Sequence, residues 1–154
     1  MANMESAQLF SYEDLVEGLK RERTYLITPE VYEGFLRLFG DCSPLHVDAA
    51  YAKTCGFSDT LMHGAILNGF ISHFIGMVFP GGRSLELSVD IRFLQPSYLG
   101  DTLRLQGKIA QKLDLHQVIV LHLTFVNQTS GATVATGRVQ VKLMSTSPSN
   151  GYEP

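Results

Sequence analysis

The sequence predicts an α+β fold in which an antiparallel sheet wraps around one long buried helix. Two observations carry this prediction. Residues 61–79 contain no Asp, Glu, Lys or Arg, and the chain after them alternates apolar and polar side chains with the period of half-buried strands. With 154 residues, 45% of them hydrophobic and 18% charged, the chain has the size of one domain with one core.

Short elements are expected before the long helix. Most begin at a residue whose side-chain oxygen can accept a hydrogen bond from a free N–H of the first turn. They are a helix from Ser11 through Leu19, a strand over 23–28, a helix from Thr28–Pro29 to Gly40, and a helix from Asp48 to about Gly56.

The long helix is expected over 63–79, and the alternation that follows predicts four antiparallel strands. Polar residues such as Asn68 would be costly in hydrocarbon, which favours a buried core helix over a membrane span. A sheet with one apolar face must cover that face, and the helix fills it. This layout is the hot-dog fold. The strands are expected at 85–93, 103–109, 118–126 and 134–143, the domain at 11–144, and flexible ends at 1–10 and 145–154.

Charge and cysteine usage narrow the function classes. The chain has 12 Lys and Arg against 15 Asp and Glu, a net charge of −3, so nothing favours nucleic-acid binding. Two cysteines, Cys42 and Cys55, cannot build a disulfide framework, and the first ten residues lack the basic and apolar regions of a signal peptide. A cytoplasmic location is therefore expected. The spacing of the cysteines and histidines matches no recognised ligand pair, so no metal is expected.

Residues 39–48 are the densest in groups that can do chemistry. Asp41 and His46 flank Pro44, which stiffens the loop. A carboxylate that hydrogen-bonds an imidazole fixes its tautomer and raises its basicity, as a general base requires. On spacing alone, the simpler interpretation is that Asp41 caps a turn and His46 lies on the surface.

A family resemblance changes that weighting. The segment Asp41–His46 resembles the D-x-N-P-L-H signature of the MaoC-like dehydratases, or (R)-specific enoyl-CoA hydratases, with Ser43 where the family usually has Asn. The likeness extends over about residues 10–143. It includes Phe57–Gly64, similar to F-x-x-x-I-V-H-G, Phe79–Gly81, similar to L-P-G, and Phe93–Asp101, similar to F-x-x-P-V-x-x-G-D.

The resemblance implies reversible hydration of trans-2-enoyl thioesters to (R)-3-hydroxyacyl thioesters. Asp41 and His46 would be the catalytic pair, and Gly64 would give its backbone N–H to the thioester oxygen. A helix N-terminus without a Cβ suits a developing oxyanion. Ser72 falls where the family often has a serine near the site, although it could equally back-bond to its own helix.

The resemblance also sets the expected partners and the alternatives. Coenzyme A is the expected carrier, as part of the substrate, with acyl carrier protein as the other possibility. No cofactor is expected, because the thioester itself acidifies the α-carbon. The alternative functions are a hot-dog acyl-thioesterase and a non-catalytic acyl-thioester-binding protein. The first usually has a carboxylate on its central helix, and none occurs between Thr60 and Ser84. A homodimer is expected because one small sheet leaves its edges unpaired.

Overall fold

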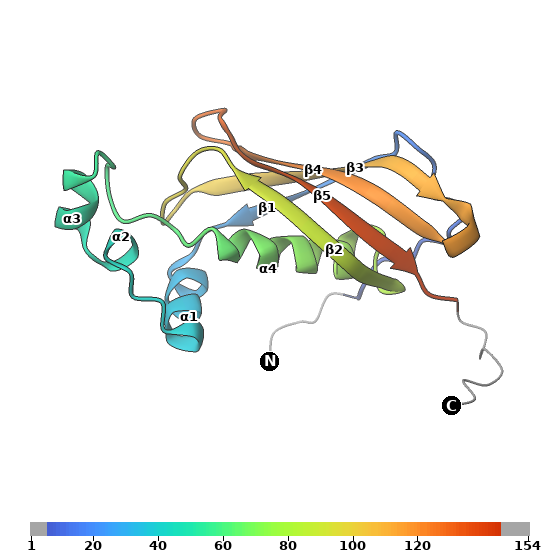
Figure 1. Cartoon of the computed structure of the whole chain (residues 1–154), viewed down its shortest axis with the longest axis horizontal. Coiled ribbons are helices and arrows are strands. Elements are labelled where there is room, and N and C mark those ends of the chain that lie inside the picture. The colour runs from blue at the N-terminus through green and yellow to red at the C-terminus, as the bar shows by residue number, and fades with distance from the viewer. Residues whose placement is uncertain (1–5, 146–154) are drawn as a thin grey trace.

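The computed structural model describes residues 6–145 and shows a five-stranded antiparallel sheet curved over helix α4 (Figure 1). The strand order is β1-β3-β4-β5-β2, so β1 and β2 form the two edges. This arrangement confirms the α+β hot-dog fold. The bounds are β1 Lys20–Leu26, β2 Ser84–Phe93, β3 Thr102–Leu113, β4 Val118–Asn127, β5 Thr133–Leu143 and α4 Ala65–His73.

Three short helices gather at the N-terminal end of α4 (Figure 1): α1 (Pro29–Phe39), α2 (Pro44–Val47) and α3 (Ala49–Thr54). The expected caps are confirmed. Thr28 accepts the Val31 N–H at 3.3 Å, and Gly40 ends α1 in the left-handed region with a φ of 66°. Asp48 accepts the Tyr51 N–H at 3.0 Å. Helix α2, a single turn, was not expected from the sequence.

The N-terminal segment differs from expectation. Ser11 accepts the Asp14 N–H at 3.3 Å as a helix cap would, but only turns follow, so the helix expected through Leu19 is wrong. The Gly18 N–H instead donates to the Ile109 carbonyl at 2.8 Å. Of the end expected to be flexible over 1–10, residues 6–10 are described, and Gln8 makes backbone hydrogen bonds to Met77 and Gly82 at 2.9 Å. Residues 1–5 and 146–154 lie outside the described residues.

The core lies between α4 and the inner face of the three central strands. The long helix begins at Ala65, two residues later than expected, and its last turn is a π-helix over Phe74–Val78. No helix within residues 6–145 is long and apolar enough to cross a membrane. Side chains that are fully buried in this core include Phe74, Phe79, Leu103, Leu105, Ile109, Leu121 and Phe125.

Edge strand β2 departs from the simple alternation. A register shift between Glu86 and Ser88 makes Leu87 the extra residue of a bulge. Leu85 is therefore opposite Lys142 on the outer face, and Glu86 is opposite the buried Val141 on the inner face. Burial raises the pKa of the Glu86 carboxyl. Leu85 and Leu87, two of the apolar residues whose alternation predicts this strand, are each 48% exposed.

Candidate active site

Three titratable side chains meet where α4 begins. One ligand atom each from Asp41, His46 and His63 lies within 4.8 Å of the others. Asp41 lies in the loop after α1, His46 in α2, and His63 directly before α4. The fold therefore brings the sequence-predicted pair together and adds a histidine to it.

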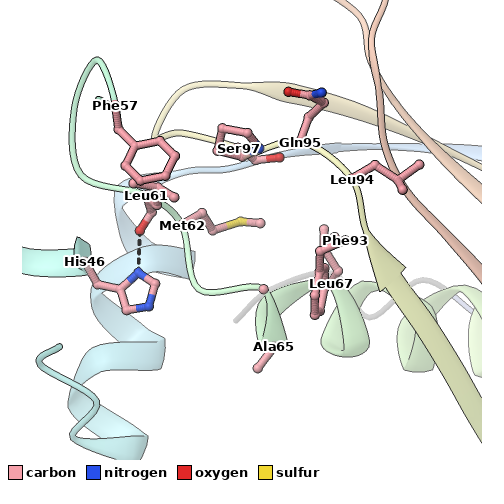
Figure 2. Close-up of a pocket in the computed structure, with 12 residues that line it drawn as sticks. His46, Phe57, Leu61, Met62, Ala65, Leu67, Phe93, Leu94, Gln95 and Ser97 are labelled. Carbon is pink, nitrogen blue, oxygen red and sulfur yellow. Dashed lines mark hydrogen bonds between the residues drawn. The ribbon is translucent and has the colours of Figure 1, made fainter. Parts of the chain in front are cut away.

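His46 is oriented by backbone groups. Its Nδ1 lies 2.8 Å from the Leu61 carbonyl oxygen (Figure 2). Because a carbonyl can only accept, Nδ1 carries the proton and Nε2 keeps its lone pair. The Tyr32 hydroxyl donates to the His46 carbonyl and holds this turn against α1. His46 is therefore set up as a base. However, the group that fixes its tautomer is the Leu61 carbonyl, and the expectation that Asp41 does so is wrong.

Asp41 is more loosely held. Its side chain is 51% exposed, and Oδ1 accepts the Ser43 N–H at 3.3 Å. Its Oδ2 lies 3.8 Å from His63 Nε2. The structure gives no direct hydrogen bond between the Asp41 carboxylate and His46. A water at about 2.8 Å from each of two groups bridges about 4.6 Å at a tetrahedral angle, which is close to the 4.8 Å within which a carboxylate oxygen of Asp41 and a ring nitrogen of His46 lie.

Gly64 borders a cavity of about 450 Å³ that His46 also lines. Figure 2 shows His46 on one side of this cavity and Phe93 on the other. Gly64 is the N-cap of α4 and offers no side-chain cap. Among residues 6–145, no acceptor is recorded for the Gly64 N–H. A Cβ here would lie 2.9 Å from the Phe93 ring, so glycine lets this ring pack close to the start of α4.

A second cavity of about 850 Å³ lies between α1 and α4, with Asp41 among its lining residues. Ala65 borders both cavities, so the cluster lies where the two meet. The walls of this second cavity are mainly apolar and include Val31, Phe35, Leu38, Phe39, Ile66 and Phe70.

Comparisons with known proteins place the chain in a family. Residues 13–129 match the family model described as "MaoC like domain". The chain belongs to this family. The "(R)-specific enoyl-CoA hydratase" of Aeromonas caviae is 30% identical over 109 residues, which is 71% of this chain and 81% of that protein.

A solved structure and a further relative are also similar to the chain. The unliganded R-hydratase PhaJ1 of Pseudomonas aeruginosa superposes with a TM-score of 0.82 at 29% identity over 96% of both chains. A mitochondrial "3-hydroxyacyl-[acyl-carrier-protein] dehydratase FERN" of Solanum lycopersicum is 35% identical over 83 residues, 54% of this chain and 48% of that protein.

Ser72 lies away from the cluster of Asp41, His46 and His63. It follows Gly64 by eight residues, which is about 12 Å along a helix axis. Its side chain is exposed, and it lines neither cavity. The structure thus groups Asp41, His46 and Gly64 but leaves Ser72 two turns away.

The cluster is poorly arranged to hold a metal. A tetrahedral zinc ion with bonds of about 2.0–2.1 Å needs ligand atoms about 3.3 Å apart. Here the three atoms lie within 4.8 Å of one another. Two of the ring nitrogens also contact carbonyl oxygens, His46 Nδ1 that of Leu61 and His63 Nε2 that of Asp41. The absence of a metal therefore stays a prediction.

His63 is not among the site residues that the sequence predicts. The structure instead places its ring at the centre of the cluster, stacked on His46 with 3.8 Å between ring centroids. The available signal was the position of His63, immediately before Gly64 in the stretch Phe57–Gly64.

Proposed function

We propose that this chain is an (R)-specific enoyl-CoA hydratase, a hydro-lyase of fatty-acid metabolism. It would add water reversibly to trans-2-enoyl thioesters and form (R)-3-hydroxyacyl thioesters. The observation that carries the proposal is the arrangement at the start of α4. An imidazole whose Nδ1 is hydrogen-bonded to a carbonyl lies within 4.8 Å of a carboxylate, and the N–H of Gly64, which has no acceptor among residues 6–145, borders the same cavity as that imidazole.

The proposed reaction needs only these groups. Asp41 and His46 hold one water, and His46 Nε2 takes a proton from it as its oxygen bonds to C3. The electron pair of the C2–C3 double bond moves toward the thioester carbonyl, and the Gly64 N–H stabilises the charge that develops on its oxygen. The proton then passes from the site to C2. The reverse sequence eliminates water, and no metal or redox cofactor takes part.

The substrate carrier follows from the same proposal. Coenzyme A is the proposed carrier, as part of the substrate, in line with the A. caviae relative's name. The tomato relative's name keeps acyl carrier protein as an alternative. The apolar cavity beside Asp41 would suit an acyl chain.

The test is a hydration assay. Mixing the protein with crotonyl-CoA should lower the absorbance of the conjugated double bond, and chiral analysis should identify the (R)-3-hydroxy product. Release of free coenzyme A without loss of that absorbance would instead identify a thioesterase. Binding without any turnover would identify an acyl-thioester-binding protein, and either result would contradict the proposal.

We further propose that the protein is a cytoplasmic homodimer. The dimer is supported by edge strand β2, where one row of backbone groups has no partner strand among residues 6–145. Four large apolar side chains on or just after this edge are 45–53% exposed: Leu85, Leu87, Phe93 and Leu94. Light scattering at micromolar concentration should give twice the mass of the chain, and a monomeric mass would contradict the dimer.

A further inference from the structure

His63 contacts each part of the proposed site without being one of its reacting groups. Its side chain is only 2% exposed. Its ring is stacked on His46 at 3.8 Å between centroids, with 30° between the planes, and packs on Phe35 at 4.6 Å. It also precedes Gly64 in the chain. Any movement of this ring therefore reaches the base and the oxyanion donor together.

A hydrogen bond links the same ring to Asp41. His63 Nε2 lies 2.8 Å from the Asp41 backbone carbonyl oxygen, so Nε2 carries the proton and donates. The only other hydrogen bond recorded for Asp41 as an acceptor, within residues 6–145, is the 3.3 Å contact of its Oδ1 with the Ser43 N–H. Of these two bonds, the one from His63 is the shorter, and it links the half-exposed Asp41 to the residues just before α4.

Packing alone does not explain a histidine here. Its neighbours include the aromatic rings of Phe35 and Tyr32, and a phenylalanine would fill the same space without a polar atom. His63 Nδ1 is buried, and it has no hydrogen-bond partner among the described residues. An unsatisfied buried nitrogen is unfavourable. The fold tolerates it at a position where the other ring nitrogen makes a bond that phenylalanine cannot make.

We propose that His63 is a positioning residue for the hydration reaction. Its Nε2–H holds the Asp41 main chain against the start of α4, while its ring supports the plane of His46. The carboxylate, the imidazole and the Gly64 N–H are thereby kept in one geometry around the reacting water and thioester. This inference rests on the proposed hydratase function, because it assigns a role within that reaction.

Three substitutions separate the hydrogen bond from the ring contact. His63→Gln keeps an amide donor near the position of Nε2 but removes the ring. His63→Met has nearly the same length and shape as Gln but no donor, and His63→Phe keeps a ring without a donor. The matched controls are the same substitutions at His122, which is exposed on the outer face of β4.

The kinetic outcome distinguishes positioning from packing. A displacement of about 1 Å in a catalytic group can cost about 10²-fold in rate. We therefore expect kcat to fall roughly 10²-fold in the Met and Phe variants, with KM changed by less than about threefold. His63→Gln should be more active than the Met variant but less active than wild type, because it restores the donor and not the ring. If the Met variant is as active as the Gln variant, or the Phe variant as active as wild type, the proposal is overturned.

A measurement independent of turnover keeps the two proposals apart. The NMR signal of the Asp41 amide should shift in the Met variant and return toward wild type in the Gln variant. An unchanged Asp41 signal in a folded Met variant would overturn the positioning role. If wild-type protein hydrates no enoyl thioester while the Asp41 signal behaves as expected, the hydratase proposal fails and the structural role of His63 stands without it.

Discussion

The two ends of α4 satisfy their backbone groups in opposite ways. At the C-terminal end, the Ile75 carbonyl accepts from the Gly81 N–H at 2.9 Å and from the Ser84 hydroxyl at 3.0 Å. The Met77 carbonyl accepts from the Gln8 N–H at 2.9 Å. At the N-terminal end, Gly64 supplies no capping side chain, and its own N–H has no recorded acceptor among residues 6–145.

This difference separates stability from binding. Groups at a helix end must be satisfied by the protein, by water or by a ligand. At the C-terminal end, protein donors satisfy the backbone carbonyls, and the side chains of Phe74 and Phe79 are fully buried there. The N-terminal end keeps a positive dipole end and a free donor beside a cavity. One helix thus anchors the core with one end and, in the proposed function, binds the thioester with the other.

The largest effect on the rate is expected from Asp41 and His46, at the N-terminal end of α4. Asp41→Asn and His46→Ala should each lower kcat by about 10²–10⁴-fold, about 3–5.5 kcal/mol in the barrier. The double variant should be barely worse than either single one, because both residues act on one water. Since Asp41 is half-exposed, thermal unfolding should change little. Near-full activity of the nearly isosteric Asp41→Asn would contradict the proposed mechanism.

A substitution at the C-terminal end of α4 should lower the free energy of unfolding and leave the rate unchanged. A Cβ at Gly81 would overlap the Gln8 carbonyl oxygen, and its φ of +93° is strained for any other residue. Gly81→Ala should therefore lower the free energy of unfolding by about 2–4 kcal/mol in a urea titration. The kcat of the folded protein should stay the same.

Gly131→Ala is the matched control for this prediction. It has a φ of +73° with nothing within 4 Å of a Cβ, so it should show only the backbone cost of about 1–2 kcal/mol. Equal losses at positions 81 and 131 would show that the contact with Gln8 contributes nothing.

A smaller effect on the rate is expected from a methyl group added at Gly64, at the N-terminal end of α4. In Gly64→Ala, the Cβ would press on the tip of the half-exposed Phe93 ring at 2.9 Å. The ring can move, so stability should change by less than about 1 kcal/mol. The shifted cavity wall should lower kcat about tenfold, or about 1.4 kcal/mol. Adding Phe93→Leu should restore part of the activity, and a purely additive double variant would argue against this contact.

The smallest effect is expected at Ser43. Its side chain makes no capping hydrogen bond at the start of α2, and Asn caps a helix as well as Ser does. Ser43→Asn also restores the residue that the family usually has here. Steady-state kinetics should show unchanged or higher activity. A loss of more than about tenfold, or about 1.4 kcal/mol, would mean that this loop is built differently from its relatives.

Local interactions made much of the fold predictable. Thr28, Gly40 and Asp48 act on backbone groups within four residues along the chain, so their capping roles can be predicted without a tertiary structure. The alternation in β3, β4 and β5 reports a buried face because both neighbours of each strand are present. The pair Asp41 and His46 was singled out by a motif, since spacing alone favoured a turn cap and a surface histidine.

Tertiary structure decided what depends on segments far apart in sequence. The Leu61 carbonyl sets the tautomer of His46 from 15 residues away, and His63 reaches back 22 residues to Asp41. Strand β2 lies at an edge with one partner strand, where a bulge can turn Leu85 outward against its own pattern. Hydrophobic periodicity describes only the preference of a strand for a face. Which residue occupies that face, and which carbonyl meets which ring nitrogen, follows from how the packed segments align in space.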